Sequence, residues 1–312
     1  MLRWLSSKLA APNSLRSRLT FPDPERLGTL SDQLARQTTD DGGALKREFS
    51  AFVSSIRIGP FWKLTYPDRL GETNRVLCAR LRELAPDKVD LLDLGGSDGI
   101  TTQDLVEHLR AALNVKVNAC MVDLYCYLLR FARAGVVEYR MTDGSPVMVR
   151  VGPLAIQLSS VSRTRNPISR TLGKFYLGRK NFRESMPQTA SFSLVNPRVT
   201  ADAGIEVLEW SALARKPELV NRLNVCRASN ILNRDYFSAD QMRCAAGHLH
   251  AYLVEGGLLI VSRNRLTTHE VEEGAIWRKE GDRFQLLEEF GGGSEAGEVI
   301  NAFRASATPT PV

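Results

Sequence analysis

The sequence has few of the residues that build covalent or metal-bound frameworks, and it has no long apolar run. Its 312 residues include five cysteines and four histidines. The cysteines are odd in number and widely spaced, and His248 and His250 would face different sides of a helix. These features argue against a disulfide scaffold or a metal site and indicate reduced core cysteines in a cytoplasmic protein. No apolar stretch approaches the roughly 20 residues that span a bilayer.

Acidic residues are missing from two stretches of the chain. Residues 1–20 contain four cations mixed with leucines and a tryptophan, and residues 163–183 contain seven cations with three aromatic residues between them. The first stretch lacks the continuous apolar core of a secretory signal. It is interpreted as a packing arm or as a peripheral contact with an anionic membrane. The second suits a nucleic acid, an anionic lipid, a carboxylate substrate or a solvated loop.

What the chain does have is a short apolar run that opens into a glycine-rich turn, KVDLLDLGGSDG at 88–99. The run 89–94 favours a buried parallel strand, because it is short and ends at once in turn residues. Gly95, Gly96 and Gly99 allow a ligand to approach the backbone closely. Residues 100–113 are predicted to form a helix whose N-terminal amides point at the turn. The sequence has neither a G-x-G-x-x-G fingerprint here nor a phosphate-binding G-x-x-x-x-G-K-[ST] loop.

A second apolar strand is predicted at 115–122, and Asp123 stands at its end. In a doubly wound sheet an acid at this place can accept hydrogen bonds from ribose hydroxyls, and its two oxygens suit a vicinal diol. The alternative is a surface aspartate that caps the next helix, which is predicted to run to about residue 134. The two signals together indicate a nucleotide-type site at the carboxyl edge of a parallel sheet.

Two stretches resemble motifs of the class I S-adenosylmethionine-dependent methyltransferases. Residues 93–99, DLGGSDG, resemble motif I, an acidic residue followed by a glycine-rich turn. Residues 223–238, LNVCRASNILNRDYFS, are similar to the motif IV region, and most of all to the chemotaxis-receptor type. They depart from it at Asn224, where an acid usually begins the strand, and in the two residues between Arg227 and Asn230. Receptor specificity therefore does not carry over. The resemblance covers about residues 72–290 without the stretch 136–200.

The resemblance implies S-adenosyl-L-methionine as the cofactor, with its ribose at Asp123 and its adenine beside Leu124. The implied cofactor-binding residues are Asp93, Gly95, Gly96, Ser97, Asp98, Gly99, Asp123, Leu124, Glu209, Trp210 and Ser229. Trp62, Tyr66 and Arg227 are predicted to bind substrate, and packing against the sheet is the alternative for the two aromatic residues. Asn230 and Tyr236 are predicted to line the reacting centre as catalytic residues. No metal is expected.

The predicted fold class is α/β, a doubly wound and mostly parallel seven-stranded sheet with an antiparallel edge, as in class I methyltransferases. The later strands are expected at 205–209, 219–226 and 258–262, with a closing hairpin at 275–290. Four regions are predicted: an N-terminal arm and helical cap at 1–71, a core at 72–135 and 201–292, an insertion at 136–200, and a C-terminal helix or disordered tail at 293–312. The insertion is expected to carry a β-hairpin and a basic loop over the active site.

The predicted function is methyl transfer to a small-molecule or lipid-like anionic acceptor, with oxygen as the favoured acceptor atom. A carboxylate is already ionised at neutral pH and needs no general base, whereas a hydroxyl benefits from one. The amino-methylating motif [DNS]-P-P-[YF] is absent. Two alternatives stay open. The first is methylation of RNA or protein with residues 163–183 as the binding arm, and the second is a cofactor-binding or partner-binding module without transfer.

Overall fold

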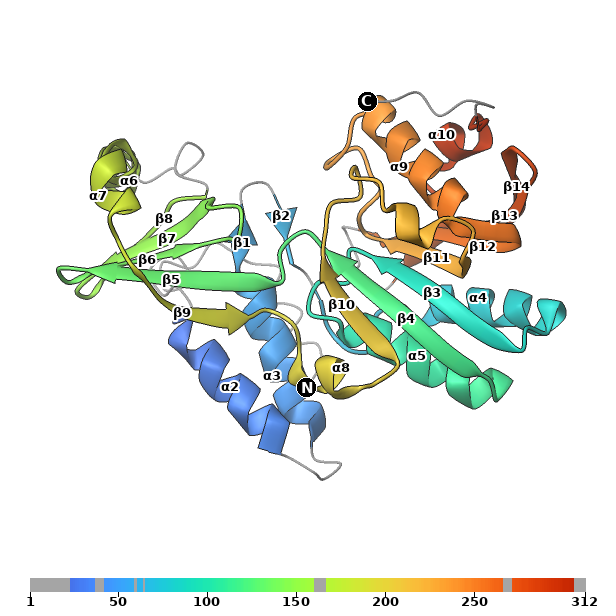
Figure 1. Ribbon diagram of the computed structural model, residues 1–312, viewed down its shortest axis with the longest axis horizontal. Coiled ribbons are helices and arrows are strands. Elements are labelled where there is room, and N and C mark those ends of the chain that lie inside the picture. The colour runs from blue at the N-terminus through green and yellow to red at the C-terminus, as the bar shows by residue number, and fades with distance from the viewer. Residues whose placement is uncertain are drawn as a thin grey trace.

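The computed structural model describes residues 23–36, 42–58, 61–63, 65–159, 167–265 and 271–305, and it contains two large sheets of different kinds (Figure 1). A seven-stranded sheet lies on the right of the view, and a five-stranded antiparallel sheet lies on the left. The predictions made for residues 1–20 and for a tail beyond residue 305 lie outside the described residues.

The seven-stranded sheet has the order β10-β4-β3-β11-β12-β13-β14. The first five strands of this order are parallel, and β13 and β14 add an antiparallel edge. The predicted fold class is therefore confirmed. The strands are β3 (Lys88–Leu94), β4 (Lys116–Asp123), β10 (Ile205–Glu209), β11 (Leu223–Ser229), β12 (Leu253–Asn264), β13 (Glu272–Glu280) and β14 (Arg283–Phe290).

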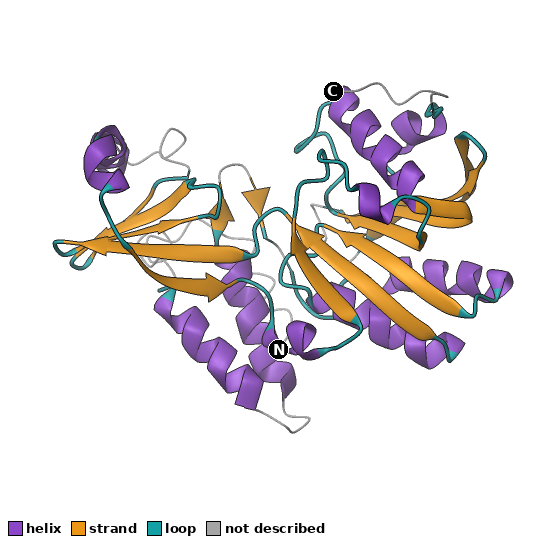
Figure 2. Ribbon diagram, in the orientation of Figure 1, coloured by secondary structure: helices purple, strands orange, loops and turns teal. Residues whose placement is uncertain are grey.

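Helices cover both faces of this sheet (Figure 2). Alternate residues of a strand point to opposite faces, so β4 sends Val117, Ala119 and Met121 to one face, where α4 (Gly71–Leu84) and α5 (Ile100–Leu113) pack on them. Val122 and its neighbours face α9 (Ala239–Tyr252) and α10 (Gly297–Asn301) on the other side. Both cores are therefore built from the same strands.

Between β4 and β10 the chain builds the second sheet, whose order is β8-β7-β6-β5-β9 and whose pairings are all antiparallel. The hairpin predicted around residues 142–146 joins β6 to β7. The helix predicted to run to about residue 134 is wrong, because β5 forms there and pairs with both β6 and β9. The inserted unit thus begins at β5 and not at residue 136. The strands are β5 (Tyr127–Arg133), β6 (Val136–Arg140), β7 (Pro146–Val151), β8 (Leu154–Gln157) and β9 (Gln188–Ser193).

Within the described residues, four helices pack on the inserted sheet. The N-terminal cap consists of α2 (Glu25–Arg36) and α3 (Gly42–Ser55), and its buried leucines and phenylalanines share one core with β5, β6 and β7. The stretch predicted as a basic loop contains α6 (Pro167–Gly178) and α7 (Lys180–Glu184) instead. Two short strands, β1 (Arg57–Ile58) and β2 (Phe61–Trp62), pair with each other, and α8 (Pro197–Ala201) leads back to β10.

Candidate functional site

Four neighbouring parallel strands, β10, β4, β3 and β11, end at the same edge of the seven-stranded sheet, and a cavity of about 270 Å³ opens there. This is the edge at which open α/β sheets bind their ligands. Its walls come from the turn after β3, the ends of β4 and β10, the segment after β11 and the segment before α4. The predicted site residues that line it are Gly95, Ser97, Asp123, Leu124, Trp210, Ser229, Asn230 and Tyr236.

The glycine-rich turn after β3 is held by backbone bonds and by close packing. The amides of Gly95 and Gly96 both donate to the carbonyl of Val122, at 2.8 and 3.0 Å. A Cβ on Gly96 would lie 2.5 Å from Met121 Cγ, and one on Gly99 would lie 2.8 Å from Val199 Cγ1. Gly96 and Gly99 are therefore required by packing inside the protein, and Gly95 is the glycine of the three that lines the cavity.

Asp93 and Arg227 do not face the cavity. Arg227 is fully buried and donates from Nε and Nη2 to the two carboxylate oxygens of Asp93, at 2.8 and 2.5 Å. Its Nη1 donates to Asn74 Oδ1 at 3.0 Å and its Nη2 also donates to the carbonyl of Thr101 at 2.8 Å. The predictions of Asp93 as a cofactor contact and of Arg227 as a substrate contact are wrong, because the two side chains are buried beneath the turn and pair with each other.

Asp98 is also turned away from the cavity. Its carboxylate accepts hydrogen bonds from Ser50 Oγ at 2.5 Å, Thr65 Oγ1 at 2.8 Å and the Ile100 amide at 3.1 Å. Burial raises the pKa of Asp98, and these hydrogen bonds oppose the rise. Asp98 therefore ties α3 and the segment before α4 to the glycine-rich turn, and its prediction as a cofactor contact is wrong.

Asp123 lies at the cavity, where Lys63 neutralises its charge. Lys63 Nζ is 2.6 Å from Oδ1, which also accepts the Tyr125 amide at 3.1 Å. Oδ2 accepts the Ser97 amide at 2.8 Å. A carboxylate offers about four acceptor positions. One position therefore remains on Oδ2, enough for a single hydroxyl and not for the two-oxygen grip on a diol that the sequence suggested.

A second cation, Arg69, lines the cavity and is 9% exposed. Burial lowers the pKa of its guanidinium, which still carries its charge because free arginine titrates far above neutrality. Sequence reasoning missed Lys63 and Arg69, because they lie in a segment with no helical or strand period. The only signal was the mixture of cations and aromatic residues at 61–69.

The segment after β11 forms the lid of the cavity. Asn230 has a positive φ of 61°. Its side-chain Nδ2 donates to Asn264 Oδ1 at 3.1 Å, and its Oδ1 accepts from the backbone amide of Asn264 at 2.8 Å. Ile231 lies over the turn, because a Cβ on Gly95 would lie 3.0 Å from Ile231 Cβ. Tyr236 lines the cavity as well. The two predicted catalytic residues are thus at the site, where the amide of Asn230 has a structural partner.

Three other predicted residues have different outcomes. Glu209 binds the inserted unit, accepting from the Cys126 amide at 2.6 Å and from Thr142 Oγ1, and it is not among the residues that line the cavity. Tyr66 lies beside Arg69, whose guanidinium is 5.8 Å from the ring centroid, and it is not among the lining residues. The side chain of Trp62 is outside the described residues.

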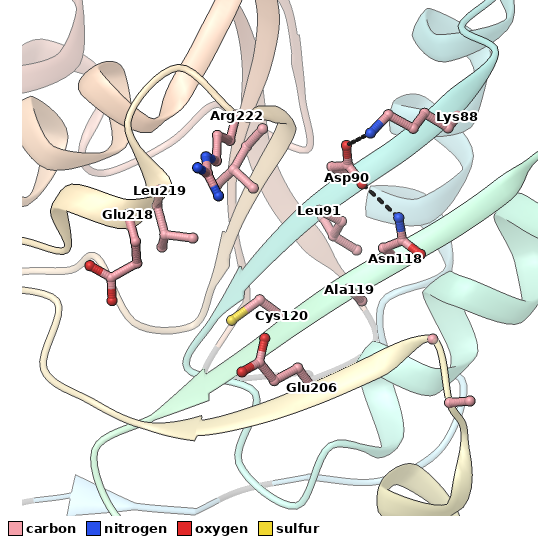
Figure 3. A pocket seen from close by; sticks show the side chains of 13 residues that line it. Lys88, Asp90, Leu91, Asn118, Ala119, Cys120, Glu206, Glu218, Leu219 and Arg222 are labelled. Atoms are coloured by element: carbon pink, nitrogen blue, oxygen red, sulfur yellow. Dashed lines mark hydrogen bonds and ion pairs between the residues drawn. The ribbon is translucent and has the colours of Figure 1, made fainter.

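A wider depression of about 760 Å³ lies toward the amino ends of the same strands (Figure 3). Its floor carries Asp90, which accepts from Asn118 Nδ2 at 2.7 Å, and its far wall is the loop with η2 (Pro217–Leu219). Burial raises the pKa of the Cys120 thiol there to about 12, so the thiol is no nucleophile at neutral pH. The cysteine of this depression therefore supplies no reactive thiolate.

Comparison with known proteins leaves the assignment to the structure itself. No protein-family model matches the sequence, and no curated protein is similar to it. Similar solved structures include an amino pentose methyltransferase from Micromonospora echinaspora with bound S-adenosylmethionine, at 11% identity, 66% of this chain, 62% of that chain and a TM-score of 0.31. Another is the N-methyltransferase NodS from Bradyrhizobium japonicum in complex with S-adenosyl-L-homocysteine. It is 13% identical, the match covers 77% of this chain and 76% of that chain, and the TM-score is 0.33.

A third is the structure of a candidate S-adenosyl-L-methionine-dependent methyltransferase from Methanococcus maripaludis, at 8% identity, with 63% of this chain and 58% of that chain covered and a TM-score of 0.30. This chain spans 51%, 58% and 62% of the lengths of three of the solved structures that it matches. TM-scores of this size carry no argument about function.

The described residues contain neither a candidate membrane span nor a candidate metal cluster. No helix there has the length and apolar character needed to cross a membrane. No group of three or more histidine, cysteine, aspartate or glutamate side chains in the described part of the chain is arranged to hold a metal ion.

Proposed function

We propose that the protein is an S-adenosyl-L-methionine-dependent methyltransferase that acts on a small-molecule or lipid-like acceptor, at an oxygen atom. The observation that carries the proposal is the cavity at the carboxyl edge, where Asp123 and the turn at Gly95–Ser97 face one space. Parallel α/β sheets bind nucleoside ligands in the crevice outside the carboxyl ends of their strands. The resemblance of residues 93–99 to motif I selects this cofactor among such ligands.

The residues around the cavity fit the nucleoside part of the cofactor. The remaining acceptor position on Asp123 Oδ2 would bind one ribose hydroxyl. Leu124, Trp210 and Leu213 offer apolar surface for the base. The volume of about 270 Å³ is just below the roughly 300 to 1,000 Å³ of typical small-ligand sites. We therefore expect the segment after β11, with Ile231, to move when cofactor and acceptor bind together.

The charges of the cavity favour an anionic acceptor. When bound, the cofactor supplies an electrophilic methyl group, which is transferred by in-line displacement. Arg69 and Lys63 bring two positive charges against the single negative charge of Asp123. The planar guanidinium of Arg69 can orient a carboxylate through two parallel hydrogen bonds. Among the described lining residues the only acid is Asp123, which Lys63 occupies, and there is no histidine. This set favours an acceptor that is ionised without a general base.

One alternative has a structural observation behind it. The Lys63–Asp123 ion pair and the position of Ile231 over Gly95 fill part of the site, as expected of a binding module that has lost transfer. Methylation of RNA or protein has less support, because the described residues of the basic stretch, 167–183, do not line the cavity.

Calorimetry with S-adenosyl-L-methionine and S-adenosyl-L-homocysteine tests cofactor binding. We expect Asp123→Asn to weaken binding about tenfold or more, because a hydrogen bond to a charged group contributes roughly 1.5 to 3 kcal/mol. Asp240→Asn is the matched control, since Asp240 is 89% exposed on α9. Absence of binding to the natural protein, or equal affinities for all three proteins, would overturn the placement of the ribose.

Transfer is tested separately with cofactor labelled in its methyl group and an extract of small acidic metabolites and lipids. We expect label in an alkali-labile product, as a carboxylate ester requires. Binding without transfer to any acceptor pool would favour the module over the enzyme.

A further inference from the structure

The helix α6 presents an apolar ridge to solvent. Ile168, Leu172 and Phe175 are 69%, 39% and 63% exposed. Their spacing of four and then three residues puts them on one side of the helix. The helix lies with α7 at the end of the molecule away from the seven-stranded sheet (Figure 1). A ridge of three large apolar side chains at an outer tip is a surface that needs a partner.

The other side of α6 is firmly attached, so the ridge is not the product of a loosely placed helix. Tyr176 is 9% exposed, and its hydroxyl donates to Glu138 Oε2 at 2.8 Å. Glu138 is fully buried and also pairs with Arg140 at 2.8 Å and Arg183 at 2.7 Å. Burial alone would raise the pKa of Glu138, but the hydrogen bonds from Arg140, Arg183 and Tyr176 outweigh it and lower the pKa. This charged cluster fixes α6 on β6 with the ridge outward.

Exposed cations lie around α6 and at its C-terminal end. Arg170, Lys174, Arg179 and Lys180 are exposed, and residues 163–183 contain no acid. The Arg179 guanidinium lies 4.7 Å from the centroid of the Phe175 ring, so a positive charge sits directly against the apolar ridge. The neighbouring acid Glu184 is 3.7 Å from Lys180 and offsets one charge only.

We propose that this face of α6 docks on an anionic lipid surface. The ridge enters the boundary between headgroups and acyl chains, where Arg179 beside it contacts lipid phosphates. The cations farther around the helix add attraction toward the anionic surface over a longer distance. Two of the three ridge residues are aliphatic, which suits acyl chains, whereas single-stranded nucleic acid is bound by aromatic residues on which its bases stack. The inference goes beyond methyl transfer and stands or falls independently of it.

Vesicle co-sedimentation of the full chain tests the proposal, with vesicles of phosphatidylcholine alone and of phosphatidylcholine mixed with phosphatidylglycerol. We expect binding to the mixed vesicles and little to the neutral ones. Ile168→Ser with Phe175→Ser should reduce partitioning about tenfold or more for each side chain. Arg179→Gln should reduce partitioning about fivefold, because one charge near the surface contributes about 1 kcal/mol. The reduction should be smaller at high salt, which screens the attraction.

Matched controls separate the α6 face from general stickiness. Leu84→Ser removes a leucine that is 45% exposed on α4, and Arg75→Gln with Arg243→Gln removes two arginines that are 64% and 61% exposed. Both controls should bind mixed vesicles as the natural protein does. Far-ultraviolet circular dichroism checks that all variants are folded, which we expect because every substitution is at an exposed position.

Three outcomes would overturn the proposal. In the first, the natural protein fails to bind the mixed vesicles. In the second, the variant with Ile168→Ser and Phe175→Ser binds them as well as the natural protein does, which would assign binding to another basic segment. In the third, the α6 variants lose affinity for a single-stranded RNA oligonucleotide in a gel-shift assay while vesicle binding is unchanged, which would identify nucleic acid as the partner.

Discussion

Arg227 and Asp93 are register partners on the neighbouring strands β11 and β3, and Arg227 donates to both carboxylate oxygens of Asp93. The two side chains are 0% and 3% exposed. The same guanidinium reaches Asn74 on α4 and the carbonyl of Thr101 on α5. One buried charge pair therefore joins two strands to the two helices that cover them, directly below the glycine-rich turn.

Removing Arg227 should destabilise the fold. Arg227→Met leaves the Asp93 carboxylate buried without its partner, and losing one member of a buried pair costs about 3 to 5 kcal/mol. We expect the free energy of unfolding in urea to fall by that amount. Arg227→Met combined with Asp93→Asn should recover part of the loss, because no charge is then left unpaired. A loss below about 1 kcal/mol in the single variant would show that the pair is not the junction described here.

The sequence was a good guide to elements with a local signal and a poor one to pairings between distant segments. The helix expected at 100–113 and the strand expected at 205–209 have those bounds in the structure, because each is an apolar stretch flanked by turn residues. The strand β5 was predicted as helix. Its sequence YLLRFAR does not alternate cleanly, and its partner β9 lies about 60 residues further along the chain.

The same limit applies to the site. Gly95, Asp123 and Trp210, which line the cavity, are predicted from patterns that occupy a few consecutive positions at strand ends. The burial of Asp98 is not predicted from the sequence, because its partner Ser50 is 48 residues away and no sequence pattern relates the two. Lys63 likewise reaches Asp123 across 60 residues.

The Lys63–Asp123 ion pair should compete with the cofactor. Lys63→Met frees an acceptor position on Asp123 Oδ1 for the second ribose hydroxyl, so we expect the affinity for S-adenosyl-L-homocysteine to rise about fivefold or more. Calorimetry measures this change. Lys88→Met is the control, because Lys88 forms a 2.7 Å pair with Asp90 at the opposite edge of the sheet. Weaker binding by Lys63→Met would instead mean that Lys63 itself contacts the ligand.

Gly96 should not tolerate a side chain. A Cβ there would lie 2.5 Å from Met121 Cγ and 3.2 Å from Thr102 Oγ1, and overpacking of this kind costs about 1 to 3 kcal/mol. We therefore expect Gly96→Ala to lower the midpoint of urea unfolding. Gly71→Ala is the control, since no atom lies within 4 Å of the added Cβ, and it should leave stability unchanged or raise it slightly. Equal midpoints for the two variants would contradict the tight packing of the turn.

Asp104 on α5 should make stability fall as the pH rises toward neutrality. Burial raises the pKa of its carboxyl to about 6, although it accepts the Asp68 amide at 2.8 Å. The unfolded chain titrates near pH 3.9. Between these values the folded protein binds more protons, so raising the pH through this window destabilises it.

Asp104→Asn keeps an acceptor for the Asp68 amide and cannot ionise. Its free energy of unfolding should exceed that of the natural protein by roughly 1 to 2 kcal/mol at neutral pH and match it near pH 4. The exposed control Asp240→Asn should differ little at either pH. A difference between Asp104→Asn and the natural protein that does not vary with pH would show that Asp104 titrates normally, because only a shifted pKa makes that difference depend on proton concentration.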